Sequence, residues 1–158
     1  MSNSQAHDLV GNYKVSGDVY VDGKVVGNIM AGGDIHVKNG VNGSLDAGGD
    51  IFVSGDIKNN ANASGDVTVI GSVGGSIDVN GDLTVTGSIG GNVKVKGDAL
   101  IGAAENPVKV GGSITVLGDL VIFADIKGDL TVKGDLELHG TVGGKIACNG
   151  EIRYKEGE

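Results

Sequence analysis

The chain has 158 residues and a net charge of −8, and 39% of its residues are apolar while only 3% are aromatic. The acidic balance argues against binding nucleic acid or anionic lipid through clusters of Lys and Arg. With 31 glycines and no tryptophan, the composition is typical of a β-solenoid with a core of small aliphatic side chains.

The N-terminal tail is polar and lacks the basic start and the apolar run of a signal peptide. No segment approaches the roughly 20 apolar residues of a membrane helix. Cys148 is the only cysteine and has no partner for an internal disulfide, which fits a reducing compartment. We expect a cytoplasmic protein with a tail over 1–8, a β-solenoid domain over 9–154 and a charged tail over 155–158.

A sixteen-residue repeat governs the chain, and it is plainest over 65–96, which reads GDVTVIGSVGGSIDVN and then GDLTVTGSIGGNVKVK. Apolar residues alternate with polar ones at the period of a β-strand. Glycines recur at positions 1, 7 and 11 of the unit, where tight corners would need them. The pattern predicts an all-β fold, a single-stranded and three-sided (triangular) β-helix of about nine sixteen-residue coils, stacked roughly 4.8 Å apart.

The coil that begins at Gly97 breaks the repeat. The expected frame continues at Gly112, Gly128 and Gly144, which makes this coil fifteen residues long, one residue short. It also holds the only proline, Pro107, which cannot donate a hydrogen bond to a β-ladder. We predict a bulged or looped corner here and a changed cross-section in the three coils that follow.

An aspartate follows the first glycine of most units, and the frame aligns these residues in a column: Asp18, Asp34, Asp50, Asp66, Asp82, Asp98 and Asp129. The column is either a cation-binding ladder or a set of carboxylates that accept hydrogen bonds from nearby backbone N–H groups, as in Asx turns. We favour the second, because calcium-binding nonapeptide repeats have another period and another placement of Asp. No metal and no cofactor is expected.

The other reactive residues do not indicate catalysis. His7 falls in the tail, and His36 and His139 fall on different sides of the unit, so the three predict neither a metal site nor a catalytic dyad. Acyltransferases on left-handed β-helices use a hexapeptide repeat, and sixteen is not a multiple of six. Cys148 falls at an inward position and is expected to be a buried hydrophobe. We therefore expect a protein that is not an enzyme.

Two kinds of surface are candidates for binding. Tyr20, His36 and Phe52 share one outward position in successive coils, which predicts a stacked aromatic face for lateral contact or for a ligand. The terminal coils should present unpaired backbone and a cut-open core, and the tails are too short and polar to cap them. The candidate end-to-end contacts are Leu9, Tyr13, Val15, Ile146, Ile152 and Tyr154.

The alternations of valine and isoleucine broken by glycine, as in GSVGGSIDV over 71–79 and GDIFVSGDI over 49–57, resemble bactofilins, the polymer-forming bacterial cytoskeletal proteins. The resemblance covers nearly the whole chain. It implies a right-handed triangular β-helix and nucleotide-independent filaments joined through terminal coils, sometimes at the inner face of the membrane. It also implies a scaffold for cell-envelope enzymes or other bactofilin-like proteins. Bactofilins usually carry proline-rich flanks, which this chain lacks, so another family of bacterial polymer-forming β-helices stays open.

The sequence thus predicts a structural scaffold protein that polymerises with copies of itself. The alternative is a monomeric β-solenoid binding module that uses the Tyr20, His36 and Phe52 face for a glycan or a protein partner. Nucleic acid is not an expected partner, because the chain is acidic.

Overall fold

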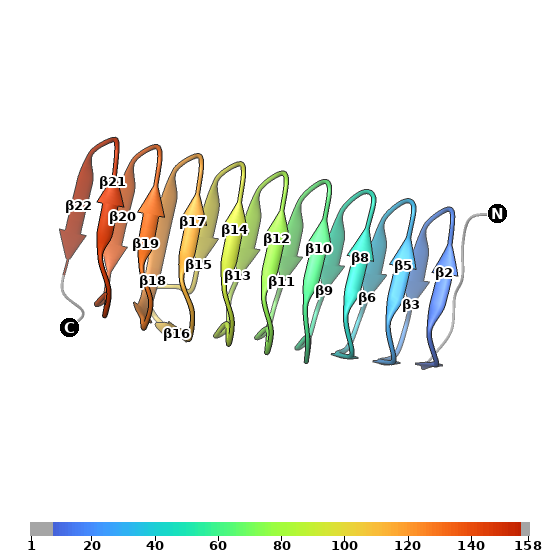
Figure 1. The fold of residues 1–158 in the computed structure, drawn as a ribbon. Helices are drawn as coiled ribbons and strands as arrows, with labels where there is room; N and C mark the ends of the chain where they lie inside the picture. The colour runs from blue at the N-terminus through green and yellow to red at the C-terminus, as the bar shows by residue number, and fades with distance from the viewer. Residues whose placement is uncertain (1–7, 156–158) are drawn as a thin grey trace.

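The structure, a computed structural model, describes residues 8–155 and contains no helix among them. The chain winds into coils that follow one another along a rod, with its first and last described strands at opposite ends (Figure 1). The strands pair in parallel between successive coils and form a β-solenoid of about nine turns, which confirms the predicted fold class.

Three faces run along the rod. The first face contains the strand that follows each Gly-Asp corner: β3 (Val19–Val21), β6 (Ile35–Val37), β9 (Ile51–Val53), β11 (Val67–Val69), β13 (Leu83–Val85), β15 (Ala99–Ile101), β18 (Leu120–Ile126), β20 (Leu136–His139) and β22 (Ile152–Lys155). The second face contains β2 (Tyr13–Val15), β5 (Ile29–Ala31), β8 (Leu45–Ala47), β10 (Ala61–Ala63), β12 (Ile77–Val79), β14 (Val93–Val95), β17 (Ile114–Val116), β19 (Leu130–Val132) and β21 (Ile146–Cys148).

The third face is narrower than the other two. It begins with the paired strands β1 (Leu9–Val10), β4 (Val25–Val26) and β7 (Val41–Asn42). It continues as single-residue bridges at Ile57, Val73 and Ile89, then as β16 (Val108–Val110) beside the end of β18, and it ends at Val142. Each coil therefore contributes two short strands and one very short side.

The core is a set of aliphatic columns. Each buried residue stacks on its counterpart in the next coil, as Val67 stacks on Leu83 and Ile77 on Val93. Along a strand the side chains alternate, so Val67 and Val69 are buried while Thr68 between them is only partly covered. No polar or charged residue is buried among those that the structure describes. This is the core that the small-residue composition predicts.

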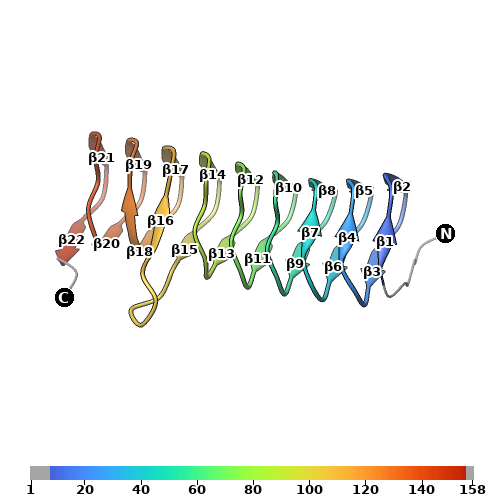
Figure 2. The same cartoon turned by 90° about the horizontal axis from the view of Figure 1, so that it is seen from below.

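The expected frame after Gly97 is wrong. Ala99 pairs with Leu120, and this coil is joined to the next by contacts between residues 21 positions apart instead of sixteen. The coil has gained residues instead of losing one. The extra residues follow β15 and form a loop that stands out from the rod (Figure 2). The loop starts at Gly102, whose φ of 78° favours glycine, and it contains Pro107, so the predicted looped corner is confirmed.

The Gly-Asp corner therefore continues at Gly118 and Gly134, while Gly112, Gly128 and Gly144 belong to the corner before the second face. The frame shifted because both corners begin with glycine followed by a small polar residue. The later coils also differ in shape, as predicted, because β18 runs for seven residues from the first face into the third and buries Ala124, whereas β13 has three residues.

Candidate functional site

Each corner of the coil carries a column of side-chain oxygens that accept a hydrogen bond from the coil that follows. At the Gly-Asp corner, the N–H of Asp82 donates to Asp66 Oδ1 at 2.8 Å. The same contact repeats along the column at 2.8–2.9 Å, with the acceptors Asp18, Asp34, Asp50, Asp66, Asp82, Asp98, Asp119 and Asp135. The other two corners use side chains such as Asn60 and Asp56 in the same way.

This geometry confirms the hydrogen-bonding interpretation of the aspartates, with the donor in the next coil instead of in the same turn. A Cβ on Gly33 would collide with Asp18 Oδ1, so the corner needs glycine directly before the residue that donates. Asp129 was wrongly placed in this column. It lies at the corner before the second face, where its Oδ1 accepts from the N–H of Lys145 at 2.9 Å.

Two of the three corner columns change character at the C-terminal end. The last residues of the three columns are Thr141, Lys145 and Glu151. Threonine keeps a hydroxyl acceptor, whereas lysine has no acceptor atom, and glutamate is one methylene longer than the aspartate that precedes it in the column. The regular side-chain ladder therefore ends at this coil at the corners of Lys145 and Glu151.

The C-terminal coil also exposes its inward residues. Ile152 and Tyr154 of β22 pair with Leu136 and Leu138 of β20, so they hold the inward register. Yet each is 51% exposed, whereas Leu136 is 1% exposed, because no described coil lies beyond them. Ile146 of β21 is exposed for the same reason.

The remaining predicted end residues are covered to different degrees. At the N-terminal end, Leu9 is buried, Val15 is half-buried and Tyr13 is exposed. Cys148 holds an inward position but is only half-buried, and its thiol lies 3.3 Å from the carbonyl oxygen of Gly134. The two ends are thus unequal, and the C-terminal end has the more open core.

The aromatic face lies where the sequence predicts it. Tyr20, His36 and Phe52 project outward from β3, β6 and β9. The Tyr20 and His36 rings stack at 5.0 Å, and the His36 and Phe52 rings are tilted at 6.0 Å. Phe52 is exposed, while the other two are partly covered. The column forms a ridge of rings across three coils of the first face.

A second ring pair on the same face was missed. His139 of β20 stacks on Phe123 of β18 with centroids 4.3 Å apart, and its Nε2 lies 2.7 Å from Glu137 Oε2. The prediction that His36 and His139 fall on different sides of the unit is wrong, and the shifted frame after Gly97 explains the error. His7 lies outside the described residues. The two histidines remain on well-separated strands, so they form no common site.

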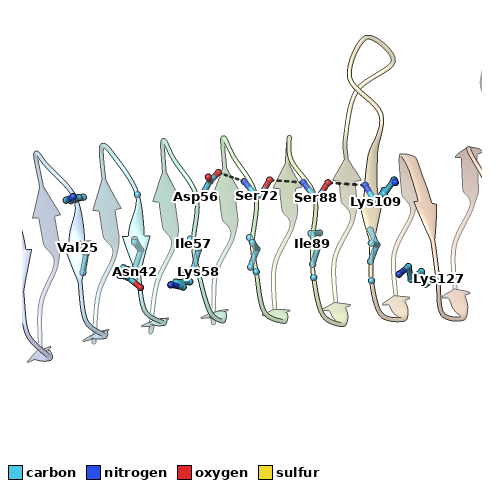
Figure 3. A pocket seen from close by; sticks show the side chains of 18 residues that line it. Val25, Asn42, Asp56, Ile57, Lys58, Ser72, Ser88, Ile89, Lys109 and Lys127 are labelled. Carbon is cyan, nitrogen blue, oxygen red and sulfur yellow. Dashed lines mark hydrogen bonds between the residues drawn. The ribbon is translucent and has the colours of Figure 1, made fainter.

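A groove on the third face was also missed. It has a volume of about 800 Å³ and is lined by residues between Lys24 and Lys127 (Figure 3). Its central coils carry only Gly or Ser beside the inward residue, as in the segment GSVGG at 71–75. This run of small residues is present in the sequence, but glycine and serine at these positions are equally typical of corners.

The described part of the chain brings together no metal-binding cluster. Among residues 8–155, no three His, Cys, Asp or Glu side chains gather closely enough to hold a metal ion. Within the same range, no helix is long and apolar enough to cross a membrane. Searches against protein-family models, curated proteins and solved structures found no match to this chain.

Proposed function

We propose that this protein is a structural building block that assembles end to end through its terminal coils, without a nucleotide. The observation that carries the proposal is the C-terminal coil, where Ile146, Ile152 and Tyr154 hold the inward register and are each between 43% and 51% exposed. In every interior coil the next coil covers the equivalent side chains. A second copy of the chain is the partner that would cover the exposed side chains of the last coil, because its coils have the same repeat.

The free energies of burial and of association favour an ordered contact between coils over nonspecific association. Covering a half-exposed isoleucine contributes roughly 1 kcal/mol. Association opposes this with an estimated 4 kcal/mol or more of lost freedom of motion. Three such side chains are therefore marginal alone, and the unpaired edges of β21 and β22 must add backbone hydrogen bonds, each worth about 0.5–1.5 kcal/mol. Both contributions are obtained together only when one coil stacks on another.

The resemblance to bactofilins supports the same proposal and suggests a location in the cell. The proposed location is the cytoplasm, including the inner face of the membrane. There the rods would act as a scaffold for cell-envelope enzymes or for other bactofilin-like proteins. The proposed protein is structural and carries out no reaction of its own.

The test is sedimentation velocity with negative-stain electron microscopy on the nucleotide-free protein and on Ile152→Arg. We expect filaments for the unmodified chain and dispersed rods for the variant, with a strand-like circular dichroism spectrum in both. Leu117→Arg is the matched control, because Leu117 is 45% exposed but lies beside a corner in the middle of the rod. Filaments that survive Ile152→Arg, or are lost equally in the control, would remove the end-coil proposal.

A second candidate function rests on the Tyr20, His36 and Phe52 stack, which offers a ridge of rings to a flat ligand. In this alternative the protein is a monomeric binding module for a glycan or a protein. The probe is a linear β-1,4-linked hexasaccharide, measured by calorimetry. Binding that is lost in Phe52→Ala but kept in Leu100→Ala, which changes the same outward column further along, would support it. A strictly dispersed protein without such binding would oppose both candidates.

A further inference from the structure

The groove on the third face follows the rod axis. Residues of seven successive coils line it, and the inward residues Val41, Ile57, Val73, Ile89 and Val110 lie along its floor. Figure 3 shows these coils side by side, with the lining side chains in a row across them. The groove therefore crosses the strands at a steep angle and fits a long, narrow occupant.

The groove is hollow because its central coils lack outward side chains. Gly74 and Gly90 follow the inward residues, and a Cβ on Gly90 would collide with the carbonyl oxygen of Gly74 in the preceding coil. Ser72 and Ser88 are equally small on the other side. Close stacking of coils explains these residues without a ligand, so the hollow shape alone does not identify an occupant.

The charged residues that line the groove indicate what kind of occupant it binds. Lys24, Lys58, Lys109 and Lys127 line it, and Asp56 is the only acidic residue among the lining residues. The groove thus carries a net charge of +3 on a chain whose net charge is −8. Such a reversal of sign attracts an anionic occupant, and the attraction weakens with salt.

No ion pair within the described chain accounts for the four lysines. All four are exposed, and none forms an ion pair with another residue of the described chain. By contrast, Lys38 pairs with Asp22 at 3.1 Å, just past the strands β3 and β6. In Figure 3, Lys109 shares one edge of the row with Asp56, while Lys58 and Lys127 lie toward the other edge, where the positive charge is concentrated.

The dimensions fit a short extended chain. From Lys24 to Lys127 the groove spans six coil steps, or about 29 Å at a strand separation of roughly 4.8 Å. An extended polypeptide rises about 3.3 Å per residue, so about nine residues fill this length. The floor's backbone groups are already used between coils, as in the bond from the N–H of Gly74 to the carbonyl of Ile57. The occupant must therefore bind through its side chains.

We propose that the groove binds an extended acidic segment of a partner protein, about nine residues long, that alternates carboxylates with aliphatic side chains. The carboxylates meet the lysines that line the groove, and the aliphatic side chains lie over the Gly and Ser residues of the central coils, because the valine and isoleucine side chains there are buried in the core. An acidic glycan fits less well, because no aromatic side chain lines the groove to stack on a sugar. This inference is independent of end-to-end assembly, which leaves the third face open.

The test uses fluorescence anisotropy with a labelled ten-residue peptide of alternating Glu and Leu. The binding variant is Lys58→Gln, Lys109→Gln and Lys127→Gln together. The matched control is Lys14→Gln, Lys94→Gln and Lys133→Gln, which removes the same charge from exposed positions on or beside the second face. Thermal melting establishes that both variants fold, and sedimentation establishes that their assembly matches the unmodified chain.

We expect the peptide to bind at low salt, to lose at least tenfold in affinity in the groove variant, and to be unaffected in the control. A peptide of alternating Gln and Leu should not bind. Absence of binding to the Glu and Leu peptide, or equal losses in both variants, would overturn the proposal. So would lysine-dependent binding of an oligogalacturonate in place of the peptide, which would assign the groove to an anionic glycan.

Discussion

An interior coil and the C-terminal coil have the same repeat and the same register but opposite surroundings. Leu136 of β20 is 1% exposed, and its partner Ile152 of β22 is 51% exposed. Asp66 accepts a hydrogen bond from the next coil, whereas Lys145 ends its column without an acceptor. The comparison teaches that the repeat specifies the shape of a coil, while its neighbours supply the stability.

The largest expected difference between an interior coil and the C-terminal coil is the stability that a core side chain contributes. Ile89→Ala removes a side chain packed on both sides and should reduce the free energy of unfolding by about 2–5 kcal/mol. Ile152→Ala removes one packed on a single side and should reduce it by less than about 1 kcal/mol. Urea denaturation of both variants, at a protein concentration where the chain does not assemble, compares the two losses of stability. Equal losses would mean that the C-terminal coil is covered by something other than a second copy.

A smaller difference is expected at the corners. Asp66→Ala removes the acceptor for the N–H of Asp82 and should reduce the free energy of unfolding by about 1 kcal/mol, since one exposed hydrogen bond is lost. Asp66→Asn keeps an acceptor oxygen and should be close to neutral. Glu151→Ala, at the end of the same column, should change stability by less than about 0.5 kcal/mol.

Hydrogen exchange provides the direct check on the corner contact. The amide of Asp82 should exchange faster in Asp66→Ala than in Asp66→Asn, because only the alanine variant leaves it open to water. If the two variants exchange alike, the contact between coils at this corner does not protect the amide, and the ladder contributes nothing to coil stacking.

The smallest expected effect concerns the loop after β15. Deleting residues 103–107 restores the sixteen-residue step between Gly97 and Gly118 and keeps the buried Val108 of β16. The free energy of unfolding should change by no more than about 1 kcal/mol, because shortening a surface loop has a weak entropic effect. Circular dichroism and thermal melting measure this. Loss of folding would show that the loop, and not the corner register, sets the alignment of the later coils.

The sequence predicted the fold because each residue type in the repeat had one physical role. Valine and isoleucine alternate inward, and glycine occupies the corners, so the period and the three sides could be inferred. The aspartate column was also understood, because like charges at coil spacing must each be engaged by a donor.

The errors came from residues whose roles are interchangeable between corners. Gly112 and Gly118 each begin a corner, and a step of fifteen looked closer to sixteen than a step of 21 did. That choice misplaced Asp129 and His139. The groove was missed because Gly74 and Gly90 suit both a tight turn and a hollow surface, and only coordinates place four unpaired lysines around them.

Electron microscopy of the purified, nucleotide-free protein tests the central claim most directly. If bare terminal coils stack on one another, micrographs should show unbranched filaments one rod wide, and their diffraction should give a continuous axial spacing of about 4.8 Å. Separate rods, each about 43 Å long for nine coil steps, at every concentration examined would contradict the account.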